Sequence, residues 1–293
     1  MRVFVTGGTG LIGSAVVAEL LGNGHTVLAL ARSDASALAV EGAGAEPVRG
    51  ALADLDVLRA GAARADGVIH LAFANDFSSP EALAEAVAEE SAALGVLGEA
   101  LVGSERPFVT VSGTPHMPGR VSTEADPLSF DGPVGGRGRA VTEVLDLASR
   151  GVRSTAVRLP RTVHNQGAGG FAGLLTGIAR QTGVSGYPGD GEQRWPAVHA
   201  LDAAVLLRLA LERAPAGSVW HAVADEGDRV RDIAAVIGRR LGLPVESVPP
   251  ETYGPLGPIF AADQPSSSTR TRRTLGWEPK HPRLLEDLEN IQP

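Results

Sequence analysis

Three glycines near the start of the sequence are spaced as in loops that hold phosphate groups. Gly7, Gly10 and Gly13 follow an apolar stretch, Arg2–Thr6, and precede a helical pattern. In this context the first glycine permits a tight turn, the second lets the backbone approach a pyrophosphate, and the third lets the helix pack close to the sheet. The start of the helix adds free N–H groups and a positive dipole end. The loop predicts a nicotinamide dinucleotide site made by Gly7, Thr9, Gly10, Leu11 and Ile12.

The residues after the second predicted strand decide which dinucleotide is preferred. A carboxylate there accepts hydrogen bonds from a ribose 2′-hydroxyl, whereas an arginine pairs with a 2′-phosphate. The strand Thr26–Ala31 is followed by Arg32 and Ser33. We therefore expect Arg32 to bind the 2′-phosphate with Ser33 as a second donor, and NADP(H) to be preferred over NAD(H). The alternative is that Arg32 is solvated and Asp34 takes the ribose.

Short apolar strands alternate with amphipathic helices around this loop and after it. The predicted strands are Arg2–Thr6, Thr26–Ala31, Gly67–Leu71, Phe108–Ser112 and Ser154–Leu159. The predicted helices are Ser14–Leu21, Pro80–Val102 and Gly138–Ser149. This alternation predicts an α/β fold with a Rossmann-type doubly wound parallel sheet, in which ligands lie at the carboxyl ends of the strands.

Beyond Val163 the alternation loosens, which indicates a second, smaller unit. The segment Gly183–Trp195 is rich in Gly and Pro, and loops of that kind commonly border a site. Further elements are predicted at Phe171–Gln181, Ala203–Glu212, Val219–Ala222 and Val230–Leu241. We expect a Rossmann domain at residues 1–165, with 197–224 returning to it, and a small C-terminal substrate lobe made by 166–196 and 225–293.

The composition is that of an ordinary globular protein and argues against several function classes. Of 293 residues, 43% are hydrophobic and 20% are charged, and the net charge of -8 gives no basic surface for nucleic acid. No apolar run is long enough to span a membrane, and a strand beginning at Arg2 leaves no room for a signal peptide, so we expect a cytoplasmic protein. Cysteine is absent and the seven histidines lack metal-ligand spacing, so neither a disulfide nor a metal is expected.

Several segments in order along the chain resemble one known family, the extended and atypical short-chain dehydrogenase/reductases, which include NAD(P)-dependent epimerases and dehydratases. The similar segments are Thr6–Gly13, Val68–Ala72, Phe108–Ser112, Glu124–Pro127, Val157–Pro160, Val198–Asp202 and Thr274–Pro279. The resemblance implies that the cofactor is also contacted by Leu52, Leu71, Ala72, Pro160 and Val163. Ala51 stands where the family has a carboxylate beside the adenine, so that contact is missing.

The family's catalytic tyrosine and lysine are missing from this sequence. In the family, a Tyr donates the proton, the Lys of the same Tyr-x-x-x-Lys segment holds the ribose and lowers the pKa of the tyrosine, and a Ser orients the carbonyl. Here Gly135 falls at the tyrosine position and Arg139 at the lysine position, and only Ser112 is unchanged. The resemblance implies that Arg139 contacts the ribose. Glu90 stands at the position of a helix asparagine, where a carboxylate moves protons if buried or pairs with Arg139.

Three other side chains are candidates for the missing proton donor. Tyr187 lies where extended members of the family place substrate-facing loops, although a surface tyrosine is the simpler interpretation. His164 follows the strand that leads to the nicotinamide, and His116 lies four residues after Ser112. A histidine titrates near neutral pH, which suits proton transfer, but a structural role is common for such residues.

The leading hypothesis is an NADPH-dependent oxidoreductase that reduces a small organic carbonyl, enone or imine. The absent tyrosine favours substrates whose reduction depends little on a protein acid. A redox-neutral epimerase, dehydratase or cyclase that retains NADP is a second hypothesis, and a non-catalytic NADP-sensing regulatory protein is a third. A homodimer is also possible. Fold alone does not decide among these functions.

Overall fold

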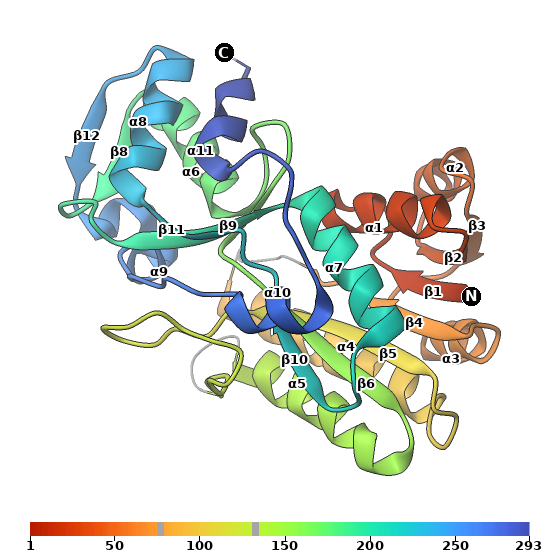
Figure 1. Cartoon of the computed structure of the whole chain (residues 1–293). Coiled ribbons are helices and arrows are strands. Elements are labelled where there is room, and N and C mark those ends of the chain that lie inside the picture. Colours follow the sequence, from red (N-terminus) through yellow and green to blue (C-terminus); the bar gives the residue numbers. More distant parts are fainter. Residues whose placement is uncertain (75–78, 131–134, 293) are drawn as a thin grey trace.

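A seven-stranded parallel sheet forms the centre of the larger part of the molecule, in the order β10-β6-β5-β4-β1-β2-β3 (Figure 1). The computed structural model describes residues 1–74, 79–130 and 135–292. The strands are β1 (Arg2–Thr6), β2 (Thr26–Ala31), β3 (Glu46–Arg49), β4 (Gly67–His70), β5 (Pro107–Gly113), β6 (Arg153–Leu159) and β10 (Ser218–His221). After β1 the chain builds two strands on one side and then returns to the other, so a crevice opens between β1 and β4.

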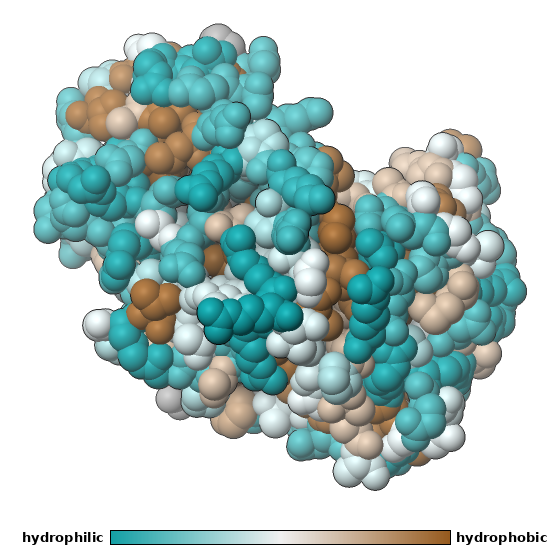
Figure 2. Space-filling view, in the orientation of Figure 1, coloured by the Kyte–Doolittle hydropathy of each residue, from teal (hydrophilic) through white to brown (hydrophobic). Residues whose placement is uncertain are grey.

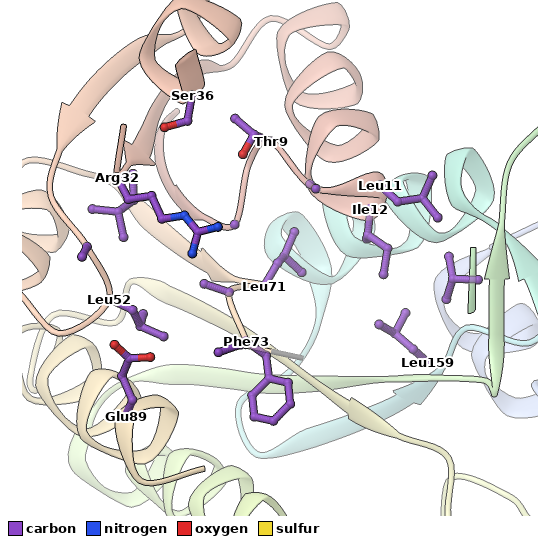
Figure 3. A pocket seen from close by; sticks show the side chains of 18 of the residues that line it. Thr9, Leu11, Ile12, Arg32, Ser36, Leu52, Leu71, Phe73, Glu89 and Leu159 are labelled. Carbon is purple, nitrogen blue, oxygen red and sulfur yellow. The ribbon is translucent and has the colours of Figure 1, made fainter. Parts of the chain in front are cut away.

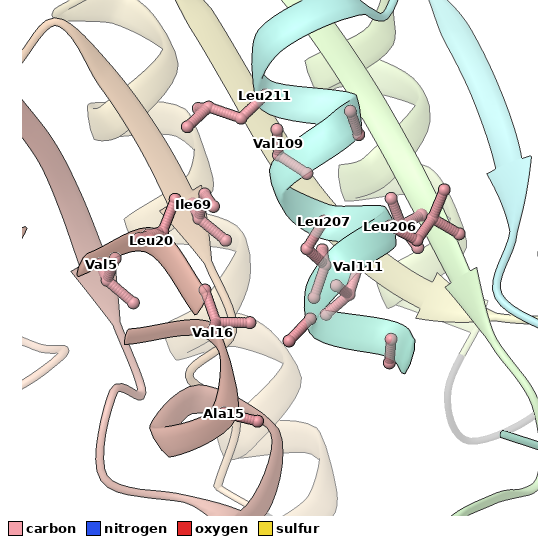
Figure 4. Packing of buried hydrophobic residues seen from close by; sticks show 14 of the residues in the cluster. Val5, Ala15, Val16, Leu20, Ile69, Val109, Val111, Leu206, Leu207 and Leu211 are labelled. Carbon is pink, nitrogen blue, oxygen red and sulfur yellow. The ribbon is translucent and has the colours of Figure 1, made fainter. Parts of the chain in front are cut away.

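Helices cover both faces of this sheet. One face carries α1 (Leu11–Gly22), α2 (Asp34–Gly42) and α7 (Ala200–Arg213), and the other carries α3 (Leu55–Ala63), α4 (Pro80–Glu99) and α5 (Gly135–Asp146). Figure 4 shows the first face, where Val16 and Leu20 of α1 and Leu207 of α7 meet Val5 and Ile69 of the strands. Such a sheet is buried on both sides, which explains its nearly unbroken apolar strands.

A smaller lobe follows β6. Its three-stranded sheet has the order β11-β9-β7, and β12 pairs with β8. Its elements are β7 (Thr162–His164), α6 (Gly170–Thr182), β8 (Ser185–Pro188), β9 (Arg194–His199), β11 (Asp225–Arg229), α8 (Val230–Leu241), β12 (Val245–Val248), α9 (Gly257–Phe260) and α11 (Leu284–Asp287). Short 3-10 turns lie at Leu147–Arg150, Pro250–Leu256 and Leu288–Asn290. In Figure 2 the lobe and the sheet domain form two masses with a concave outline between them.

The end of the chain returns from the lobe to the sheet domain. Helix α10 (Thr269–Leu275) contacts α7 and β10, and Trp277 is buried in the same core as α1 and α7. The indole Nε1 of Trp277 donates to the carbonyl of Asp202 at 2.9 Å, and the carboxylate of Asp202 accepts from the backbone N–H groups of Lys280 and His281. The sheet domain therefore includes residues near the C-terminus. The division at 165, 197, 224 and 225 stays a prediction.

The fold class expected from the sequence is confirmed, and the five predicted strands are present with ends shifted by at most one residue. Helix α1 starts at Leu11, three residues before its predicted start, because Gly10 is already its N-cap. The predicted helix Gly138–Ser149 begins at Gly135 instead. The elements α2, β3 and α3 were not predicted. In the described ranges no helix has the length and apolar character needed to cross a membrane.

Candidate functional site

The crevice between β1 and β4 holds a cavity of about 600 Å³, which is a size typical of ligand sites. It lies at the carboxyl ends of the central strands and is bordered on one side by the lobe (Figure 3). Most of the predicted cofactor contacts line it: Gly7, Thr9, Gly10, Leu11, Ile12, Arg32, Leu52, Leu71, Ala72, Pro160 and Val163. Ser33 and Arg139 do not line it.

Each of the three loop glycines is required by its surroundings for a different reason. Gly7 has φ +74°, and a Cβ there would lie 2.8 Å from the backbone nitrogen of Ala72. A Cβ on Gly13 would lie 1.9 Å from the carbonyl oxygen of Gly7, so helix α1 approaches the loop as closely as backbone atoms allow. A Cβ on Gly10 would meet only that same oxygen, at 3.6 Å, so its exposed face is free for a ligand.

The start of helix α1 fits a dinucleotide pyrophosphate. No side chain caps the helix at Gly10 and no acidic residue lies in its first turn, as far as the described residues show. Its first backbone N–H groups, at Leu11 and Ile12, therefore face the cavity without an acceptor from a cap. The cavity, the three glycines and this uncapped N-terminus together suit NAD or NADP.

Beneath the loop, Thr6 and His70 join the ends of β1 and β4. The Thr6 hydroxyl oxygen accepts from the backbone N–H groups of Leu71 and Ala72, both at 3.3 Å, and lies 2.9 Å from Nδ1 of His70. The Thr6 hydroxyl and Nδ1 of His70 therefore share a buried hydrogen bond between the two strand ends. Burial, reinforced by the positive charge of Arg137, lowers the pKa of His70 to about 3. His70 is thus neutral and fixes the floor of the cavity.

The adenosine end of the cavity carries one free cation. Arg32 is exposed, extends into the cavity in Figure 3, and forms no ion pair with any residue that the structure describes. Asp34 instead forms an ion pair with Arg49, with 2.5 Å between its Oδ1 and Nη2 of the arginine. Ser33 caps helix α2 by accepting from the backbone of Ser36, and it is Ser36 that lines the cavity. Sequence reasoning missed Ser36, although its place three residues after a serine N-cap was a usable signal.

Helices α4 and α5, which carry the expected catalytic region, are joined by an ion pair. Both carboxylate oxygens of Glu90 accept from Arg137, at 2.6 Å from Nε and 2.7 Å from Nη2. The expectation that Glu90 pairs with Arg139 is therefore wrong, because Arg139 is exposed and its Nη1 donates to the carbonyl of Phe130 at 3.0 Å. The Arg137 guanidinium lies 3.9 Å from the centroid of the Phe73 ring, which lines the cavity.

The position of the missing tyrosine is closed by the backbone. A Cβ on Gly135 would lie 2.0 Å from the carbonyl oxygen of Phe130, and a Cβ on Gly138 would lie 2.8 Å from that of Ser129. The segment at Ser129 and Phe130 therefore packs directly on the first turns of α5. Glycine at 135 is a requirement of this packing as well as a lost proton donor.

None of the other predicted catalytic residues lines the cavity. Ser112 is buried, and its hydroxyl has no hydrogen-bond partner among the residues described. His164 is 1% exposed and its Nδ1 pairs with Asp287 at 2.9 Å inside the lobe. Tyr187 lies in β8, which pairs with β12 at the far side of the lobe, and His116 is exposed. The structure does not bring these residues together.

Comparisons with known proteins agree with the fold and the loop. Residues 3–136 match the model of the NAD dependent epimerase/dehydratase family. An uncharacterized protein of Schizosaccharomyces pombe is 44% identical over 98% of this chain and 98% of its own length. The chain belongs to the NAD dependent epimerase/dehydratase family. It is thereby an NAD(P)-dependent enzyme of oxidoreductase type, and the resemblance noted in the sequence is confirmed.

Two further similarities describe the breadth of this family. A ketoreductase of Stigmatella aurantiaca is 28% identical over 75% of this chain and 67% of its own. A double mutant of dTDP-glucose 4,6-dehydratase from Streptomyces venezuelae, solved with NAD bound, superposes with a TM-score of 0.80 at 20% identity, covering 99% of this chain and 95% of that one. The latter shows the shared fold.

Besides Ser36, three aromatic or charged cavity residues were not predicted: Phe73, Glu89 and Arg161. Arg161 directly follows Pro160 at the end of the segment that leads to the nicotinamide, so its place in the chain was a usable signal. Glu89 precedes Glu90 on α4, and helix geometry turns the two side chains to different sides. Within the described ranges no group of three or more acidic, His or Cys side chains is arranged to hold a metal ion.

Proposed function

We propose that this protein is an NADPH-dependent reductase that acts on a small organic substrate with an activated carbonyl, enone or imine group. The observation that carries the proposal is the set of polar side chains around the cavity. In the part of the chain that the structure describes, these are Thr9, Arg32, Ser36, Glu89 and Arg161. No tyrosine, lysine or histidine is among them.

This set of side chains favours reduction over a redox-neutral reaction. An epimerase or dehydratase that works by transient oxidation must first remove a proton from a substrate hydroxyl, which needs a base beside the nicotinamide. The carboxylate on the cavity wall, Glu89, lies next to Leu52 on the side of Arg32 and away from Leu159 (Figure 3). Hydride addition to an already polarised double bond needs no acid or base from the protein, because water entering the cleft supplies the proton. The ketoreductase among the relatives supports the same direction.

The bound cofactor would supply the hydride, and the residues of this chain would position it. The glycine loop and the start of α1 hold the pyrophosphate through backbone N–H groups, and Leu71, Ala72, Pro160 and Val163 border the space expected for the nicotinamide. His70 and Thr6 keep the carboxyl ends of β1 and β4 at a fixed separation. Phe73, held under Arg137, covers part of the cavity wall.

NADP is the proposed form of the cofactor because of Arg32 and Asp34. Arg32 is free to pair with a 2′-phosphate, whereas the carboxylate of Asp34, which would favour NAD, is held by Arg49. Dissociation constants for NADPH and NADH, measured by fluorescence for the wild type and for Arg32→Ala, test this. We expect about a tenfold or larger loss for NADPH and less than about twofold for NADH. Unchanged NADPH binding in Arg32→Ala would show that Arg32 does not bind the 2′-phosphate.

The reductase activity is tested by following NADPH absorbance with a panel of ketones, enones and imines. Oxidation of NADPH by at least one class supports the proposal. No oxidation by any class overturns it. In that case, purified protein that retains nucleotide through repeated dialysis would favour the redox-neutral alternative, and unliganded protein that binds NADP only reversibly would favour a sensor. A homodimer and a cytoplasmic location stay predictions.

A further inference from the structure

Arg161 is a half-buried cation on the cavity wall, and no residue that the structure describes supplies a counter-charge to it. It directly follows Pro160, and both residues line the cavity. Its Nε is buried and has no hydrogen-bond partner, and no carboxylate of the described chain lies within ion-pair distance of it. Burying the N–H of a charged group without an acceptor is costly, and an anionic ligand in the cavity would offset that cost.

The guanidinium of Arg161 is oriented by an aromatic ring of the lobe. It lies 5.3 Å from the ring centroid of Phe171, which itself packs against Trp195 and Phe260. Stacking uses the flat face of a guanidinium and leaves its N–H edges available for a planar, two-point acceptor. Burial lowers the pKa of Arg161 to about 10, so the group stays charged at neutral pH.

The start of helix α6 adds positive potential at the same place. Gly170, the first residue of α6, lines the cavity beside Arg161. In the first turn the N–H of Phe171 donates to the carbonyl of Arg161 at 3.2 Å and the N–H of Ala172 donates to Oγ1 of Thr162 at 3.4 Å, so the helix acts here through its dipole. The helix is 13 residues long, so its N-terminus carries a full dipole end. The guanidinium and the dipole at the helix start both favour an anion.

We propose that Arg161 binds a carboxylate of the substrate and thereby positions the reducible group beside the nicotinamide. The inference deepens the proposed function and rests on it. It adds a substrate class: small, largely apolar acids in which the carboxylate lies near an activated double bond. A carboxylate matches the fork of the guanidinium in two hydrogen bonds, which fixes orientation as well as affinity.

The cofactor itself is a poor partner for Arg161. Arg32 follows β2 and Arg161 follows β6, and the strands β1, β4 and β5 lie between these two in the sheet, so Arg161 lies far from the expected place of the 2′-phosphate. The pyrophosphate is already met by the glycine loop and helix α1. The oxidised nicotinamide ring is a cation and would repel the guanidinium unless an anion lay between them.

The test compares an acid with its neutral amide on protein saturated with NADP⁺. Cinnamate and cinnamamide have nearly the same shape, and isothermal titration gives the dissociation constant of each. We expect the wild type to bind cinnamate about tenfold or more tightly than cinnamamide, which is the usual value of charge-assisted hydrogen bonds. Arg161→Gln should remove this preference while leaving cinnamamide binding within about twofold, and Arg161→Lys should keep part of it.

Arg59→Gln is the matched control, because Arg59 is an exposed arginine on α3 that does not line the cavity. This control should bind cinnamate and cinnamamide with the affinities of the wild type. Arg161→Gln and Arg59→Gln should both bind NADPH as tightly as the wild type does. Equal affinity for acid and amide, or no binding of either, overturns the inference. If the protein binds the acid selectively through Arg161 but oxidises no NADPH, the carboxylate subsite is supported and only the proposed reductase activity is rejected.

Discussion

Arg137 and Glu90 form a two-point ion pair that bridges helices α5 and α4, with the carboxylate 2% exposed. The same guanidinium covers the face of Phe73, so one side chain joins two helices to the wall of the cavity.

Removing the charge of Glu90 should destabilise the protein. Glu90→Gln leaves Arg137 half-buried without a carboxylate, and loss of one partner of such a pair costs about 3 kcal/mol. Urea unfolding of the wild type and the variant measures the difference. The control is Glu89→Gln, which changes the neighbouring, cavity-facing carboxylate. A loss in Glu90→Gln no larger than in the control would contradict the bridging role.

Two alanine substitutions in the glycine loop should separate folding from cofactor binding. Gly13→Ala places a Cβ 1.9 Å from the Gly7 carbonyl oxygen and should reduce both the melting temperature and NADPH affinity. Gly10→Ala meets no atom closer than 3.6 Å, so it should leave the melting temperature within a few degrees and still weaken NADPH binding, because the methyl group enters the space of the pyrophosphate. Gly22→Ala, with open space around its Cβ, is the control.

Restoring the family's tyrosine and lysine should fail to create a normal active site. In Gly135→Tyr/Arg139→Lys, the new Cβ at 135 overlaps the Phe130 carbonyl oxygen at 2.0 Å, and the shift needed to relieve it disrupts the start of α5. We expect a lower melting temperature and no gain in ketone reduction. Arg139→Lys alone should remain folded, since Arg139 is exposed. A stable double variant with higher turnover would show that the segment at Phe130 moves aside.

Asp228 in β11 should make the stability depend on pH. Burial, followed by the negative charge of Asp225, raises the pKa of Asp228 from 3.8 to about 6. The folded state therefore keeps a proton that the unfolded state loses, so this residue lowers stability as pH rises from about 4 to about 6. Asp228→Asn should melt at a higher temperature than the wild type at neutral pH and at a similar temperature near pH 4. Asp56→Asn, which changes an exposed carboxylate on α3, should show no such divergence.

The fold was predictable where a local pattern is tied to a single physical cause. The spacing of Gly7, Gly10 and Gly13 is one such pattern, since the backbone leaves no room for a Cβ at Gly7 or Gly13, and the open face of Gly10 suits a ligand. Strand β3 was missed because Glu46–Arg49 lies at the sheet edge, where half-exposed positions show no apolar run. Residues 75–78 and 131–134 lie outside the described structure.

The candidate site was predictable for its cofactor half and much less for its chemistry. Contacts such as Leu71 and Pro160 follow from strand ends, which converge at one edge of a parallel sheet. The roles expected for His164 and Glu90 depended on long-range partners, Asp287 and Arg137, that no local pattern contains. Arg161 could not be singled out from the sequence, because only the folded structure shows that its buried Nε has no hydrogen-bond partner among the described residues.

The anchoring of Trp277 to Asp202 bears on how the protein is made. The tryptophan fills the core beside α1 and α7, so that core is incomplete until residues close to the C-terminus have left the ribosome. Domains generally fold as units during synthesis, starting from the N-terminal end. Here most of the nucleotide-binding half precedes the lobe in the sequence, yet its core is complete only once Trp277, 75 residues after Asp202, has been synthesised.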